Sequence, residues 1–162
     1  MTTAHVAFLR GISNVPMQPY RAALVDLGLA DVRSFGGTGN MLFRTDATDL
    51  EALERSIAEA VGVEVFVRTR HTLAAAVSQN PYAGWPGAAV FFARRPIDAD
   101  READLMAGGF DGDPPVISGT EVHFVHPLRR PGRQSIIDLE RELGVRGTMR
   151  AAHVVERVLE LM

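Results

Sequence analysis

The clearest pattern in the sequence is a Gly-rich turn between two apolar runs. The runs are Asp31–Phe35 and Met41–Phe43, and the stretch Ser34–Phe43 places three glycines and Asn40 between them. Gly and Asn reach positive φ at little cost, so the pattern predicts two antiparallel strands that meet in a tight turn. Apolar runs predict two further strands, at Ala4–Leu9 and Val63–Arg68.

Amphipathic helices are predicted on both sides of this hairpin. The first stops at Gly28, and its apolar residues recur at helical spacing: Met17, Tyr20, Ala23, Leu24 and Leu27. The second is expected to take Asp46 as its N-cap and to end at Gly62, with an apolar stripe formed by Leu50, Leu53, Ile57 and Val61. The order β-α-β-β-α-β is the ferredoxin-like pattern.

The second half of the chain repeats this order, with Ser118–Thr120 as a weaker copy of the hairpin turn. A helix at about Thr72–Gln79 and a turn-rich stretch lead into it. Strands are expected at Ala88–Ala93, Pro115–Ile117 and Glu121–Val125. Helices are expected at Asp98–Ala107, Gln134–Leu143 and, as the last element, Thr148–Leu161. The repeat rests on pattern and not on identity, so a duplication is a hypothesis.

These elements predict an α+β protein in two parts. A ferredoxin-like N-terminal half is followed by a second, similarly patterned α+β half with C-terminal helices. We place the first subdomain at residues 1–80, a Pro/Gly-rich bridge at residues 81–87, and the second subdomain at residues 88–162.

The composition excludes several kinds of chemistry. All 17 basic residues are Arg, which removes Schiff-base and P-loop lysines, and the absence of Cys removes disulfides, thiolate nucleophiles and cysteine-bound zinc. A net charge of -3 disfavours bulk nucleic-acid binding but leaves room for a local basic patch. The N-terminus has no basic region and no apolar run is long enough for a membrane span, so we expect a cytoplasmic protein.

Several stretches resemble the domain-of-unknown-function 1697 family. They are Phe8–Ile12, Val15–Met17, Leu27–Arg33, Gly39–Phe43 and Leu139–Val145, with Thr148 and Arg150 beyond the last. The resemblance extends over essentially the whole chain. It implies an α+β protein with ferredoxin-like subdomains and no established biochemical activity.

The chain resembles a divergent member of that family. The usual long Gly-rich loop after the Leu-Arg-Gly-Ile motif is here nearly closed at Ser13-Asn14, and the usual Ser-Lys pair before the penultimate helix is Gly132-Arg133. The usual Asn-Trp-Asn-Thr run at the last helix is Ala151–Val154. A functional site shared by the family at that run would be lost or altered here.

Three candidate groups for chemistry each favour a structural or surface role, which for His153 is that of a surface or capping residue. The hairpin glycines and Asn40 fit an anion nest, but no Gly-Lys-Ser/Thr follows them, so turn formation is favoured. His123 and His126 would face opposite sides of a strand, and no other zinc spacing exists. His153 follows Arg150 by three positions on the predicted last helix, where the two side chains would share a face.

The basic segment Arg129–Arg133 is the most suggestive feature for ligand binding. It precedes the predicted helix Gln134–Leu143, and a helix N-terminus favours anions that Arg grips in bidentate fashion. The alternative is a solvated loop with weak ion pairs. Arg10, at the end of the first strand, is expected to converge on the same cleft by analogy with other strand-end sites.

Three functions stay open. The first is a small binding module for an anionic, phosphorylated or nucleotide-like ligand at a cleft between the halves. The second is an enzyme whose catalytic groups cannot be identified from sequence, and the third is a protein-interaction domain that uses the sheet or the bridge Tyr82–Trp85. No metal, cofactor or membrane partner is expected, and the sequence sets no oligomeric state. The expected ligand-binding residues are Arg10, Asn40, Arg130, Arg133, Arg150 and His153.

Overall fold

The structure is a computed structural model that describes all residues, 1–162. Its internal packing divides the chain into two compact units. Unit 1 comprises Met1–Ala75 and Glu156–Met162, and unit 2 comprises Ala76–Val155. None of the helices is both long and apolar enough to cross a membrane.

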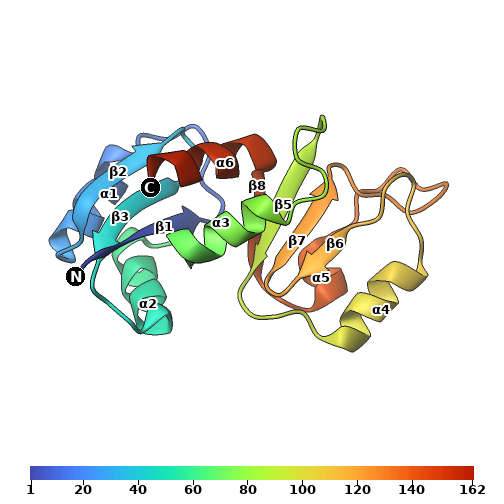
Figure 1. Cartoon of the computed structure of the whole chain (residues 1–162), viewed down its shortest axis with the longest axis horizontal. Coiled ribbons are helices and arrows are strands. Elements are labelled where there is room, and N and C mark those ends of the chain that lie inside the picture. Colours follow the sequence, from blue (N-terminus) through green and yellow to red (C-terminus); the bar gives the residue numbers. More distant parts are fainter. The chain divides into compact units, whose positions relative to one another are not determined.

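Unit 1 has the ferredoxin-like arrangement that the sequence predicts (Figure 1). Its four strands are antiparallel and lie in the order β2-β3-β1-β4. The elements are β1 (Thr3–Leu9), α1 (Gln18–Asp26), β2 (Ala30–Phe35), β3 (Asn40–Thr45), α2 (Leu50–Val61), β4 (Val65–Thr69) and α3 (Arg70–Ser78), whose last residues belong to unit 2.

Unit 2 has the same element order and the same strand order, β6-β7-β5-β8, again antiparallel throughout. The predicted repetition of the fold pattern is therefore confirmed. The elements are β5 (Ala88–Ala93), α4 (Ala99–Ala107), β6 (Val116–Ser118), β7 (Glu121–Val125), α5 (Leu139–Leu143), β8 (Gly147–Ala151) and α6 (Ala152–Leu161), whose last turns belong to unit 1.

Three predicted boundaries are wrong. The expected helix Thr148–Leu161 begins instead with strand β8, because these residues pair with β5 along its length and this tertiary pairing overrides local helical periodicity. The expected helix Gln134–Leu143 is only the five-residue α5, since Asp138 caps it by accepting from the Arg141 amide. Helix α2 takes Asp49 as its N-cap rather than Asp46.

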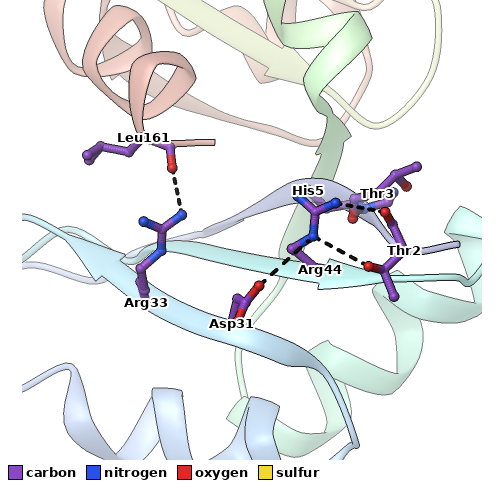
Figure 2. A network of polar contacts seen from close by, with 7 residues as sticks. All are labelled: Thr2, Thr3, His5, Asp31, Arg33, Arg44 and Leu161. Atoms are coloured by element: carbon purple, nitrogen blue, oxygen red, sulfur yellow. Dashed lines mark hydrogen bonds and ion pairs between the residues drawn. The ribbon is translucent and has the colours of Figure 1, made fainter.

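The core of unit 1 fills the space between its sheet and the helices α1 and α2. Alternate residues of the strands point to this face, where they meet Leu24 of α1 and Ile57 of α2, both fully buried. The opposite face of the sheet meets the end of α6, where Arg33 of β2 donates to the Leu161 carbonyl at 2.6 Å (Figure 2). Arg44 ties β3 to the N-terminus through the Thr2 carbonyl at 2.9 Å.

The core of unit 2 lies on the equivalent face of its sheet, but its large side chains stand at different positions. In unit 1 the strand pair Ala7–Val67 is small and α2 covers it; in unit 2 the equivalent pair is Phe91–Met149. The Phe91 ring lies against Gly147, where an added Cβ would stand 2.2 Å from Phe91 Cζ. Gly147 is therefore required for this packing.

We predict that Gly147→Ala destabilises the protein by about 1–3 kcal/mol, the usual cost of overpacking a well-packed core. The matched control is Gly37→Ala, because a Cβ there meets only ordinary contacts at 3.9 Å. Urea unfolding of both variants gives the comparison. Equal midpoints for the two would show that Phe91 is not held against Gly147.

Candidate functional site

In unit 1, the predicted site residue Asn40 has a structural role. It is buried, and its side-chain amide donates to the Phe35 carbonyl at 3.0 Å and to Thr38 Oγ1 at 3.1 Å. These bonds close the hairpin turn. Arg10 lies partly exposed at the end of β1, and its backbone amide donates to the Glu64 carbonyl at 2.9 Å.

In unit 2, Arg130 fastens the end of α4. Its guanidinium donates to the carbonyls of Leu105 at 2.7 Å and Gly109 at 3.0 Å, where a helix C-terminus leaves carbonyls unpaired. It also lies 3.6 Å from a Glu142 carboxylate oxygen and 5.2 Å from the centre of the Phe110 ring. The two hydrogen bonds occupy both donors of Nη1, and the ion pair holds Nη2 beside Glu142.

Arg133 lies in an exposed turn in which its amide donates to the Arg130 carbonyl at 3.0 Å. The helix that the sequence placed directly after it does not begin there. Helix α5 starts at Leu139, and the carboxylate of Asp138 already caps it. Arg133 therefore does not lie at the N-terminus of a helix, which corrects the predicted helix start but not the predicted ligand contact.

Arg150 and His153 do not share a helix. Arg150 is on β8 and buried, and its guanidinium donates to Thr148 Oγ1 at 2.8 Å and to the Met149 carbonyl at 2.9 Å. Burial lowers the pKa of Arg150 to about 10, so it remains a cation at neutral pH. His153 lies exposed on α6.

The sheet face of unit 2 that carries Arg150 also carries His123. Both residues pair with Val90 of β5, on opposite sides of it. His123 is fully buried (0% exposed), and neither ring nitrogen has a hydrogen-bond partner. Burial lowers the pKa of His123, and the nearby Glu121 carboxylate opposes this only in part. In the sheet of unit 1, the position equivalent to that of His123 is occupied by Leu42.

The exposed arginines of unit 2 gather elsewhere, at the end of α5. An open pocket of about 370 Å³ is lined there by Arg95, Arg141 and Arg146, and by two carboxylates, Asp138 and Glu140. We call these five residues with Arg101 the arginine pocket. Arg101 belongs to it because its guanidinium lies about 3.1 Å from where a Cβ of Gly144 would stand. All four arginines are exposed.

Two arginines of the pocket have protein partners and two have none. Arg95 donates to the Gly144 carbonyl at 3.0 Å, and Arg146 pairs with Glu140 at 3.3 Å. The side chains of Arg101 and Arg141 make no hydrogen bond or ion pair with protein groups. The pocket thus keeps two uncompensated guanidinium groups, which suit phosphate or carboxylate oxygens.

Part of this pocket could be predicted from the sequence. Arg94 and Arg95 follow β5 as Arg10 follows β1, because the Arg94 amide donates to the Arg146 carbonyl just as the Arg10 amide donates to Glu64. The strand-end argument that predicts Arg10 as a site residue in the first half therefore also predicts Arg94 and Arg95 in the second. The sequence does not predict Arg141 and Arg146 as site residues, because only the short helix α5 brings them to the same pocket.

The bridge Tyr82–Trp85 is only partly exposed. Tyr82 is buried and its hydroxyl donates to the Pro114 carbonyl, whereas Trp85 is 48% exposed. No group of three or more His, Asp or Glu side chains is placed to hold a metal ion.

Residues 1–122 match the family described as "Protein of unknown function (DUF1697)". The chain belongs to this family. The DUF1697 match covers β1 through β6 and the first two residues of β7, and it ends before α5. No curated protein matches the chain.

A solved structure shares the fold of this DUF1697 protein. It is the conserved bacterial protein SP0830 from Streptococcus pneumoniae, with a TM-score of 0.67 and 14% sequence identity over 99% of each chain. At that identity the likeness concerns the fold alone.

We predict that Arg130→Ala lowers the free energy of unfolding by about 1.5–3 kcal/mol, the range for hydrogen bonds to a charged group. Arg133→Ala, in the same loop, should change it by no more than about 0.5 kcal/mol because its side chain is exposed. Chemical denaturation measures both. A neutral Arg130→Ala would contradict the structural role of this residue.

We also predict that His123 makes the protein less stable in acid. The folded-state pKa lies below the unfolded value of 6.5, so the stability is fully present above pH 6.5 and falls as pH drops toward the folded pKa. His123→Leu should remove this loss and stabilise the protein by about 1–3 kcal/mol, because two unpaired buried nitrogens disappear.

Unfolding free energies at several pH values between 5 and 8 test the role of His123. His153→Ala serves as the control, since this histidine is exposed and should leave the acid sensitivity as in the wild type. A His123→Leu variant with unchanged acid sensitivity would assign the loss to other groups.

Proposed function

We propose that this protein is a binding module for a small anionic ligand, of the phosphorylated or nucleotide-like class, and that the arginine pocket of unit 2 receives it. The observation that carries the proposal is the pair Arg101 and Arg141, two exposed guanidinium groups without protein partners beside an open pocket. Arginine presents several donors in a fixed fork, and this geometry matches the oxygens of phosphate and carboxylate.

The carboxylates of the pocket do not cancel this attraction. Glu140 accepts from the Gly147 amide at 3.1 Å with one oxygen and pairs with Arg146 through the other. Asp138 accepts from the Arg141 amide at the start of α5. Both carboxylates are therefore engaged in holding the local backbone, and four arginines face them.

The exposure of the arginines determines the affinity of the binding and its dependence on salt. Charges in contact with water are screened over about 8 Å at physiological salt, and single exposed ion pairs contribute about 0–1 kcal/mol. Binding of a bare anion is thus expected to be weak and to weaken further with added salt. The enzyme and protein-interaction alternatives have no comparable cluster of side chains in their support.

We predict that Arg141→Gln weakens binding of inorganic phosphate by up to about 1 kcal/mol, a factor of about five, while leaving the unliganded stability unchanged, because the Arg141 side chain has no protein partner. In the wild-type protein, phosphate at about a hundred times its Kd should raise the free energy of unfolding by about 2.7 kcal/mol. Unfolding with and without phosphate, at low and moderate salt, measures this gain.

Arg133→Gln is the matched control, because it removes an equally exposed arginine of unit 2 from outside the pocket. It should retain the full gain in stability. If Arg133→Gln loses the gain and Arg141→Gln retains it, the basic loop Arg129–Arg133 binds the anion and the arginine pocket does not. The absence of any gain in the wild type would refute the anionic ligand.

A further inference from the structure

An apolar cavity lies beside the arginine pocket in unit 2. Its volume is about 180 Å³, and its floor is formed by buried side chains, among them Phe91, Phe124 and Leu128. Ile136 and Met149 line it as well but stand 53% and 44% exposed, so they form its mouth. Large apolar side chains this exposed at the mouth of an apolar cavity indicate a binding surface.

The cavity exists because α5 is shorter than its counterpart in unit 1. Helix α2 has 12 residues and buries Leu53 and Ile57 against the sheet, whereas α5 has five. Both helices start at an Asp cap and end at a left-handed Gly, so the missing turns leave the sheet uncovered between these fixed ends. Phe91 and Met149 extend into this space without filling it.

The size and lining of the cavity select an apolar ring. A cavity of about 150 Å³ with Leu, Ile and Phe walls stays dry and takes up benzene, so 180 Å³ accommodates one ring of similar size. The rings of Phe91 and Phe124 offer aromatic contacts, and the flexible thioether of Met149 adapts to the shape of a guest.

The cavity and the arginine pocket share two lining residues, Asp138 and Glu140. Both carboxylates are held by backbone amides, of Arg141 and Gly147 respectively, so they form a fixed boundary between the two sites. Positive charge adjoins this boundary, since Arg146 pairs with Glu140 at 3.3 Å and Arg141 lines the same pocket. A ligand with an apolar ring and an anionic group on a short link matches both sites at once.

We propose that the ligand of this protein is a small aryl anion, whose single ring enters the cavity and whose phosphate or carboxylate meets the arginine pocket. The inference rests on the proposed function for the anionic part. The cavity adds the apolar part, which the arginines alone do not specify.

Calorimetric titration with four probes tests this ligand class: inorganic phosphate, toluene, phenyl phosphate and benzyl phosphate. Burial of the ring should make the better of the two aryl phosphates bind roughly tenfold to a hundredfold more tightly than inorganic phosphate. The two aryl probes differ in the length of the link, which allows for the span between the sites.

Two variants block the cavity without touching the arginines. Met149→Trp fills the mouth, and Ile136→Glu places a charge there at a position exposed enough to tolerate it. Both should reduce the affinity for aryl phosphate to that for inorganic phosphate and leave the latter unchanged. Met106→Trp is the control, since this exposed methionine of α4 lines neither site and should bind all probes normally.

The outcomes separate this inference from the proposed function. If inorganic phosphate binds and the aryl phosphates bind no more tightly, the aryl ligand is refuted while the anionic ligand stands. If aryl phosphates bind equally well to Arg141→Gln, the arginine pocket does not hold the anion and both proposals fail. If toluene binds and none of the phosphates does, the aryl anion is refuted as the ligand.

Discussion

Strand β1 in unit 1 and strand β5 in unit 2 are interior strands of their sheets, hydrogen-bonded on both sides and buried on both faces. Residues Val6–Leu9 and Phe92–Ala93 are inaccessible to water. An antiparallel sheet often exposes one face to solvent, but neither face can be exposed here because large apolar side chains point to both faces. Each sheet must therefore be covered on both faces.

Unit 2 meets this requirement differently from unit 1, and the difference creates its sites. Helix α5 buries Leu139 and Leu143 as α2 buries Leu53 and Ile57, but with only five residues its apolar stripe is shorter, and Phe91 and Met149 occupy part of the space from the side of the sheet. The remaining gap is the apolar cavity. The same shortening brings the end of α5 close to its start, which gathers Asp138, Arg141 and Arg146 around one pocket.

The sequence was sufficient for the architecture because that information is local. The hairpin turn at Gly39 and the helix stop at Gly62 each depend on a few neighbouring residues, and both predictions are confirmed. Strand β8 was missed because its pairing with β5 joins residues far apart in the chain. The structural role of Arg130 could not be predicted for a similar reason: its carbonyl partners, Leu105 of α4 and Gly109 just after that helix, do not show in the spacing of charges.

The two sites of unit 2 have unequal energetic roles. Exposed arginines attract an anion over distance, but water and salt limit each contact to about 0–1 kcal/mol. Complete burial of an apolar ring contributes about 1.5–3 kcal/mol and is hardly affected by salt. In the proposed complex, the cavity therefore supplies affinity, and the arginines supply orientation and the choice of charge. The buried cation of unit 2, Arg150, instead makes hydrogen bonds to Thr148 and to the Met149 carbonyl.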